Sequence, residues 1–259
     1  MVAFLTHGIA RTGFNAALVA IVGVVIAGCG APRDPDLEKR ARTAMAAYEA
    51  SEAEAEAHKA TVTGGIKIPQ LRVFSGGDTA RVLGAVSGTG PLRAEIQTST
   101  GTILCTLDEK HSPIAVTNFV GLATGTLAWK DRSGRARNES YYAGLSFHRV
   151  LPGYIIQGGK RANAGSDGGP GWTIAREAGQ PIHFNAPGAL AFVESGTNAH
   201  AGQFFIAATT APELAKTYGA FGSCTNLAVI ARIAAAPMTA GEPERPQAPV
   251  EIKAVRVYR

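Results

Sequence analysis

Residues 146–159 read Ser-Phe-His-Arg-Val-Leu-Pro-Gly-Tyr-Ile-Ile-Gln-Gly-Gly, and residues 202–206 read Gly-Gln-Phe-Phe-Ile. Polar and apolar side chains alternate in both segments, which is the pattern of β-strands whose two faces meet different surroundings. Each segment sets a forked hydrogen-bonding group, the guanidinium of Arg149 or the amide of Gln203, beside apolar and aromatic positions. This combination suits a site for an uncharged polypeptide backbone.

The composition favours one domain built mainly of short strands. The chain has 259 residues, 46% of them hydrophobic, which is enough for one well-buried domain plus accessory segments. Its 31 glycines and 14 prolines lie mostly in short clusters after residue 60, as expected where many strands are joined by turns. The 25 Lys and Arg against 20 Asp and Glu are spread along the chain, so we expect no nucleic-acid partner.

The N-terminal region has the layout of an export signal. Residues 14–28 form an apolar run that is too short for a comfortable membrane span, which predicts a signal peptide over residues 1–28. The sequence Ile26-Ala27-Gly28-Cys29 resembles the lipobox of bacterial lipoproteins, in which the cysteine is lipidated and the chain is cut before it. We therefore expect an exported protein that is anchored to the membrane through Cys29. An uncleaved anchor and a plain secretory signal are the alternatives.

The residue after the cysteine bears on where such an anchor would lie. Gly30 stands there instead of an aspartate. By resemblance to Gram-negative lipoproteins, this favours the periplasmic side of the outer membrane.

Two segments separate the signal from the main domain. Residues 29–60 are dense in Ala, Glu, Lys and Arg, and their few large apolar side chains predict a lipid-anchored, solvated helical spacer. A small coiled coil or a partner-binding helix is the alternative. Residues 61–91 carry a few β-prone residues between turn signals and are interpreted as a linker or accessory segment, which leaves residues 92–259 for the main domain.

Local patterns predict the elements of this domain. Residues 94–98 and 102–107 alternate on either side of a Ser-Thr-Gly turn and indicate a hairpin. Ser112 as N-cap, Pro113 as first helical residue and Gly125 as terminator indicate a helix. A second helix is expected over residues 227–234. Further strands are expected around Phe147, Ile155, Leu190, Phe204 and Phe221 and over residues 250–258.

The two opening segments, together with Pro113–Val120 and Phe221-Gly222, resemble the cyclophilin-type peptidyl-prolyl cis-trans isomerases over residues 93–259. The resemblance implies a mostly β fold, a closed eight-stranded antiparallel β-barrel with two capping α-helices, here preceded by the signal peptide and the helical spacer. It also implies an isomerase that acts on X-Pro bonds in unfolded or newly exported polypeptides without a metal or other cofactor. We expect a monomer.

Arg149 is the residue expected to carry the catalysis. Rotation about an X-Pro bond is opposed by amide resonance, with a barrier of about 18–20 kcal/mol, and needs no nucleophile, metal or proton transfer. The prolyl nitrogen gains a lone pair in the twisted state, so a positioned guanidinium can donate to it more strongly there. In the family the matching arginine has this role, and the residues matching Gln157 and Gln203 hold the substrate backbone and orient the arginine. A surface arginine paired with a carboxylate is the alternative.

The resemblance also assigns an apolar pocket for the proline ring, with Phe205 as its floor. Ordinary core packing is the alternative for each lining residue. The pocket is lined by Tyr154, Ile155, Phe205, Leu214 and Tyr218.

Four more residues complete the predicted substrate-binding set. Phe147 and His148 precede Arg149, and His148 is expected to be structural and not a proton carrier. Val193 and Glu194 depart from the usual sequence of the family by adding bulk and a negative charge, which is expected to narrow or alter the subsite before proline.

Two features have two interpretations each. Cys105 and Cys224 either form a disulfide in an oxidising compartment or leave Cys105 as a buried free thiol. Residues 129–142 carry several basic side chains and are either a surface insertion that contacts partners or lipid head groups or a solvated loop.

The main rival to an isomerase is a binding module. This would be a non-catalytic cyclophilin-fold chaperone or scaffold in the cell envelope, in which Val193 and Glu194 have exchanged turnover for affinity. Its peptide binding would survive the loss of Arg149. A third hypothesis is an envelope structural protein whose essential part is the spacer at residues 37–59.

Overall fold

The structure is a computed structural model that describes residues 72–162, 169–177, 182–195 and 198–259. The predicted signal peptide, Cys29 and the helical spacer lie outside the described residues. Within the described ranges, no helix combines the length and the apolar character needed to cross a membrane.

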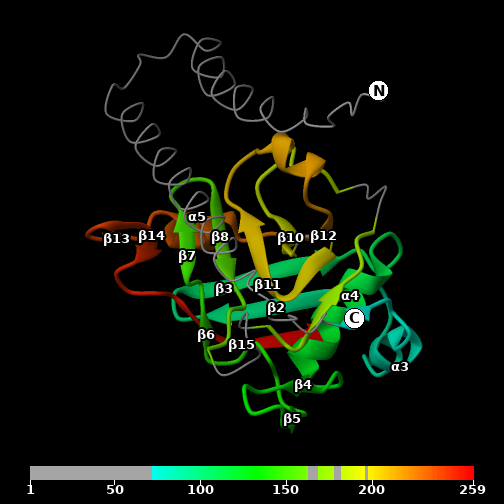
Figure 1. Cartoon of the computed structure of the whole chain (residues 1–259). Helices are drawn as coiled ribbons and strands as arrows, with labels where there is room; N and C mark the ends of the chain where they lie inside the picture. The colour runs from blue at the N-terminus through cyan, green and yellow to red at the C-terminus, as the bar shows by residue number, and fades with distance from the viewer. Residues whose placement is uncertain (1–71, 163–168, 178–181, 196–197) are drawn as a thin grey trace, which may run out of the picture. The chain divides into compact units, whose positions relative to one another are not determined.

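Most of the described strands belong to one curled sheet of eleven strands (Figure 1). Its path runs through β1 (Arg72–Phe74), β9 (Trp172–Ile174), β11 (Asn198–Ala207), β10 (Ala189–Ser195), β12 (Ala220–Cys224), β3 (Gly101–Leu107), β2 (Arg93–Thr98), β15 (Glu251–Tyr258) and β6 (Leu145–Ser146). Off this path, β8 (Ile155–Gly158) pairs with β11 and with β7 (Arg149–Leu151). The predicted hairpin of residues 94–98 and 102–107 is confirmed as β2 and β3.

The mostly β fold is confirmed, but the sheet differs from the predicted ring of eight strands. Its pairings run along an open path, with β6 at one end and β7 on a side branch, and among the described residues no pairing joins these two strands. The closed barrel therefore stays a prediction. The additional strands are short ones such as β1 and β9, which pair in parallel and gave no alternating signal in the sequence.

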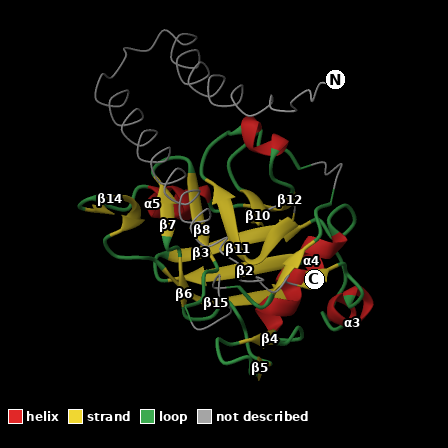
Figure 2. Ribbon diagram, in the orientation of Figure 1, coloured by secondary structure: helices red, strands yellow, loops and turns green. Residues whose placement is uncertain are grey.

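The described residues form three α-helices, two of them as predicted (Figure 2). The first expected helix is α4 (Pro113–Thr124), and it ends at Gly125, whose φ of 76° is a left-handed conformation that glycine adopts without strain. The second is α5 (Leu227–Ala234), with the predicted bounds. The third is α3 (Thr79–Gly84), which packs against α4. The sequence had assigned α3 and β1 to a linker or accessory segment.

The N-terminus of α4 is capped differently from the sequence expectation. The Ser112 side chain makes no capping hydrogen bond, and the backbone N–H groups of Ile114 and Ala115 instead donate to the two carboxylate oxygens of Glu177, at 2.7 and 2.9 Å. Burial raises the pKa of Glu177, and these two hydrogen bonds oppose the rise. Glu177 thus satisfies two amides that would otherwise be unpaired at the start of a buried helix.

Replacing Glu177 with alanine should therefore lower the free energy of unfolding by about 1–2 kcal/mol, the usual effect of losing an N-terminal cap. Urea unfolding followed by circular dichroism measures this loss. A Glu177→Gln variant keeps one acceptor oxygen and should lose less. Equal stability of all three proteins would show that the carboxylate does not cap α4.

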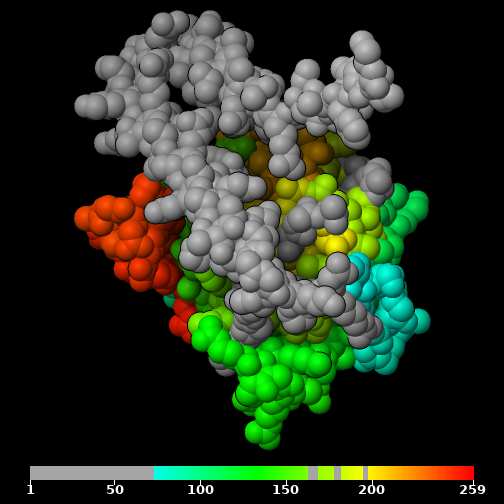
Figure 3. All heavy atoms as spheres, in the orientation of Figure 1, coloured from blue at the N-terminus to red at the C-terminus, as the bar shows by residue number. Residues whose placement is uncertain are grey.

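The insertion at residues 129–142 is anchored in the core and exposes only its tip. Trp129, Tyr141 and Tyr142 are fully buried. β4 (Trp129–Lys130) and β5 (Ala136–Arg137) form a small hairpin at the lower edge of the view in Figure 3, and its exposed part begins at Lys130. In its turn the carboxylate of Asp131 accepts several hydrogen bonds, first among them that of Ser133, and these lower its pKa to about 2. The solvated-loop interpretation thus holds for the tip alone.

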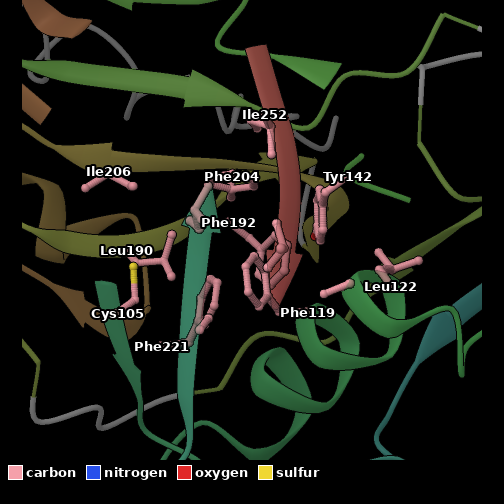
Figure 4. Close-up of a cluster of buried hydrophobic side chains, with 14 of the residues drawn as sticks. Cys105, Phe119, Leu122, Tyr142, Leu190, Phe192, Phe204, Ile206, Phe221 and Ile252 are labelled. Atoms are coloured by element: carbon pink, nitrogen blue, oxygen red, sulfur yellow. The ribbon is translucent and has the colours of Figure 1, made fainter. Parts of the chain in front are cut away.

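The main core lies where α4 meets one face of the sheet (Figure 4). Phe119 of α4 has its ring centroid 5.8 Å from that of Phe204 and 5.4 Å from that of Phe221. Phe192 stacks on Phe221 with 4.6 Å between centroids. These rings come from β10, β11 and β12, so burial of one helix residue holds three strands in place.

Cys105 and Cys224 form a disulfide at the edge of this core. They lie opposite each other on the paired strands β3 and β12, and both side chains are nearly fully buried. Of the two interpretations that the sequence left open, the structure has the disulfide.

Candidate active site

Three neighbouring strands bring the predicted polar residues together. Arg149 on β7 lies directly opposite Gln157 on β8, and Gln157 lies opposite Phe205 on β11. Gln203 lies two residues before Phe205 on the same strand. Because side chains two apart on a strand share a face, the pairing register places the two glutamines near the guanidinium.

A chain of hydrogen bonds links these side chains. Nη1 of Arg149 donates to Oε1 of Gln157 over 3.0 Å, and Nε2 of Gln157 donates to Oε1 of Gln203 over 3.1 Å. The chain is continued by His200, whose Nδ1 accepts the backbone N–H groups of Gly202 and Gln203 and whose Nε2 lies 3.2 Å from Nε2 of Gln203. Gln157 therefore orients the guanidinium and is itself oriented by Gln203, which His200 contacts in turn. Sequence reasoning missed His200, which carries no signal of its own.

Arg149 also forms an ion pair with Glu244, the kind of pairing that the sequence weighed as its alternative. Nε of Arg149 donates to Oε2 of Glu244 over 2.5 Å, and Nη2 donates to Oε1 over 3.1 Å. The Arg149 side chain remains 27% exposed, so a ligand can still reach it. Arg149 is thus paired with the carboxylate of Glu244 and at the same time hydrogen-bonded to Gln157.

The predicted proline-pocket residues form one apolar cluster beside this polar chain. Phe205, Ile155 and their buried neighbours make up its base, whereas Tyr154, Leu214 and Tyr218 are partly buried against it. Tyr218 meets Phe205 edge to face, with 4.9 Å between centroids. Partly buried rings around a buried floor leave apolar surface for a small ring such as that of proline.

Two residues that the sequence did not assign support this pocket. Phe184 stacks on Phe205 from behind, with 5.9 Å between centroids, and is fully buried. Glu213 accepts a hydrogen bond of 2.6 Å from the Tyr154 hydroxyl, which fixes the position of that ring. Burial and then this carboxylate raise the pKa of Tyr154, so the phenol stays protonated.

A cavity of ≈ 390 Å³ adjoins the pocket at Tyr218. Its wall includes Phe192 and Glu194 of β10 and Ala215 and Lys216 of the 3₁₀-helix η1 (Pro212–Lys216). Glu194 forms an ion pair with Arg176, and Val193 packs against the pocket cluster. Glu194 thus borders a hollow next to the pocket, while Val193 belongs to the cluster itself.

The two residues before Arg149, Phe147 and His148, differ in burial, and both were predicted to contact substrate. Phe147 is fully buried in the main core, with 6.1 Å between its centroid and that of Phe204, so its predicted contact with substrate is wrong. His148 is partly buried, and within the described residues its Nδ1 has no hydrogen-bond partner. Desolvation, followed by the charge of Lys160, lowers the pKa of His148 to about 4. A neutral imidazole at ordinary pH agrees with the expected structural role.

The site has the means for polar and apolar contact with a peptide. In the described part of the chain, no three His, Cys, Asp or Glu side chains are grouped so that they could hold a metal ion. The groups present are an oriented guanidinium, two amides and an aromatic pocket. They can bind a backbone carbonyl or a prolyl nitrogen and enclose a ring.

Comparisons with known proteins agree with this geometry. The sequence model of the family described as cyclophilin type peptidyl-prolyl cis-trans isomerase/CLD matches residues 93–257. The chain is 33% identical over 166 residues to peptidyl-prolyl cis-trans isomerase A of Mycobacterium tuberculosis, which covers 63% of this chain and 91% of that protein. It is 35% identical over 170 residues to peptidyl-prolyl cis-trans isomerase B of Streptomyces anulatus, which covers 64% and 96%.

A solved structure shows the same fold. The crystal structure of a Cryptosporidium parvum cyclophilin type peptidyl-prolyl cis-trans isomerase is similar with a TM-score of 0.55 at 23% identity, covering 66% of this chain and 99% of that chain.

Proposed function

The chain belongs to the cyclophilin-type peptidyl-prolyl cis-trans isomerase family and is thus an isomerase of X-Pro bonds, and we propose that Arg149 carries its catalysis beside an apolar proline pocket. One observation supports this assignment above the others. The guanidinium of Arg149 is fixed by Gln157 at the border of a cluster that contains Phe205 and Tyr218. A donor that lies beside an apolar cluster matches the two parts of an X-Pro unit.

The mechanism is non-covalent. The pocket holds the proline ring while Gln157 and Gln203 hold the substrate backbone. As the X-Pro bond twists, amide resonance is lost and the prolyl nitrogen becomes an acceptor, to which an N–H of Arg149 donates. Stabilisation that is stronger in the twisted state than in either planar state lowers the barrier in both directions. No proton is transferred, and the guanidinium acts throughout as a charged donor.

The second candidate function is peptide binding without turnover. The observation that favours it is the ion pair between Glu244 and Arg149, which engages Nε and one N–H of Nη2 of the guanidinium. Exchange NMR on a short X-Pro peptide separates the two, because it reports binding and isomerisation in the same sample. Faster cis-trans exchange with the full-length chain supports the enzyme. Line broadening by binding alone, without faster exchange, would support the binding module.

We further propose that the substrates are unfolded or newly exported polypeptides and that lipids on Cys29 hold the protein at the periplasmic side of the outer membrane. The support is in the sequence, where the apolar run of residues 14–28 ends at Ile26-Ala27-Gly28-Cys29. The disulfide between Cys105 and Cys224 adds support, because disulfides persist mainly in oxidising compartments outside the cytosol.

A Cys29→Ser variant should therefore carry no lipid and, because a lipobox chain is cut only after its cysteine is lipidated, should be found as the longer, uncut chain. Several acyl chains anchor a protein stably, so the unchanged chain should resist extraction by salt and be released by detergent. Cell fractionation followed by immunoblotting measures both. If Cys29→Ser and the unchanged chain have the same size on the immunoblot, Cys29 does not direct lipidation and cutting, and the lipid-anchor proposal is wrong.

A further inference from the structure

The guanidinium of Arg149 is held on two sides by different parts of the chain. Glu244 accepts from Nε and Nη2, and Gln157 accepts from Nη1, so all three nitrogen atoms are engaged. We propose that Glu244 is a positioning residue, which holds Arg149 in the orientation that isomerisation requires. This inference rests on the proposed catalytic role of Arg149 and extends it to a residue far along the chain.

Glu244 is presented by a hairpin that the sequence analysis did not identify. The hairpin consists of β13 (Met238–Thr239) and β14 (Glu242–Pro246), which turn at Gly241 with a φ of +79°. Figure 1 shows it beside β7, against which β14 packs. In the space-filling view, the orange atoms of this region stand out at the left edge (Figure 3).

The base of the hairpin is fixed to the rest of the domain. The backbone N–H of Gln247 donates to the carbonyl of Pro237 over 2.9 Å, and Met238 packs against the main core. These contacts fix the hairpin, so Glu244 approaches the guanidinium from a defined direction. A carboxylate on a mobile loop would not hold the arginine in one orientation.

The geometry leaves donors for a substrate. A guanidinium has five N–H groups, and the three hydrogen bonds described use one on each nitrogen, so one N–H on Nη1 and one on Nη2 remain. The carboxylate also balances the charge of the guanidinium. The pair therefore presents oriented donors with little net charge, which suits an uncharged peptide backbone.

Holding the arginine in advance should raise the rate. A free arginine side chain has many rotamers, and freezing them each time the twisted state forms would raise the barrier. A side chain that is already fixed avoids this loss, so its effect should appear in the chemical step and not in the binding of the ground state.

The test is a double-mutant cycle on the full-length chain, with kcat and KM from exchange NMR on an X-Pro peptide. Glu244→Ala should lower kcat about tenfold and change KM less than twofold, and Glu244→Gln, which keeps one acceptor oxygen, should fall in between. The matched control is Glu242→Ala on the same hairpin. Among the described residues Glu242 forms its ion pair with nearby Arg245, at 3.2 Å, and its loss should leave kcat unchanged. Circular dichroism and thermal unfolding confirm that each variant is folded.

The cycle separates positioning from general support of the fold. If Glu244 acts through Arg149, adding Glu244→Ala to Arg149→Ala should cause no further loss. Additive losses in the double variant would overturn the inference. An unchanged kcat in Glu244→Ala would also overturn it, and so would a higher kcat, which would mean that the carboxylate keeps the arginine away from the substrate. Full activity in Arg149→Ala would refute the catalytic role of Arg149 itself. Loss in Arg149→Ala without loss in Glu244→Ala refutes only the positioning role.

Discussion

An Arg149→Ala variant is expected to isomerise an X-Pro peptide with a kcat/KM roughly a hundred- to a thousandfold below that of the unchanged chain, the range seen when one donor to a transition state is removed. The loss arises because alanine offers no N–H to the prolyl nitrogen when the bond is twisted. The pocket around Phe205 and Tyr218 does not depend on the guanidinium, so the peptide should still bind. Exchange NMR with peptide in excess measures the rate, and titration of the same peptide measures the affinity.

Two controls sharpen this test. Arg149→Lys keeps the positive charge but loses the planar fork that meets Gln157 and Glu244 at once, so it should recover little of the activity. Arg256→Ala removes an exposed arginine from β15 and should leave the rate unchanged. An Arg149→Ala variant that is folded and fully active would contradict the proposed mechanism. A chain that binds the peptide equally well with and without Arg149 and never accelerates exchange would favour the binding module.

Elements with strong local signals were predictable from the sequence. The hairpin of β2 and β3 follows from alternation around a short turn, and its burial also alternates along β2. The bounds of α5 were predicted from its apolar residues Leu227, Ile230 and Ile233, and the latter two are buried as expected, whereas Leu227 is exposed. The contact of Arg149 with Gln157 was implied by the resemblance to the family, and the structure has it between the paired strands β7 and β8.

Features that depend on distant parts of the chain were not predictable in this way. Glu244 lies 95 residues after Arg149, and Glu177 lies 63 residues after the helix amide that it caps. Neither segment carries a sequence signal that names the partner of its acidic residue, so only the fold reveals what the two carboxylates contact. The strand β1 has three residues and pairs with β9, about a hundred residues later. Such a short strand is defined by its partner and not by its own sequence.

Phe147 shows the opposite error, in which a motif was applied too broadly. It lies two residues before Arg149 in a segment with a strong resemblance, and it was assigned to the groove with its neighbours. The side chain instead packs on Phe204 in the main core. Phe147 and Arg149 are two residues apart and would share a face if both lay in one regular strand. They do not, because β7 begins at Arg149.

Removing the disulfide should have the largest effect on stability. A Cys105→Ala/Cys224→Ala double variant is expected to lose about 2–5 kcal/mol of unfolding free energy, which for a domain of this size lowers the melting temperature by roughly 5–15 °C. The bond joins residues 119 apart and so closes a long loop. Without it the loop is open in the unfolded chain, whose conformational entropy is therefore higher. The bond also joins β3 to the last residue of its paired strand β12, beside the core of Figure 4. Guanidinium unfolding under non-reducing conditions measures the loss.

Reduction provides the matched control, because it breaks the same bond without changing the sequence. A thiol reductant should lower the unfolding midpoint of the unchanged chain to near that of the double variant, and it should leave the midpoint of the double variant where it was. If the unchanged chain unfolds at the same denaturant concentration with and without reductant, either the two cysteines are not bonded in the folded protein or the bond contributes nothing to its stability. Thiol labelling of the denatured, unreduced chain separates these cases, since bonded cysteines take up no label. In the first case the support that the disulfide gives to an exported location would be lost as well, and that proposal would rest on residues 14–29 alone.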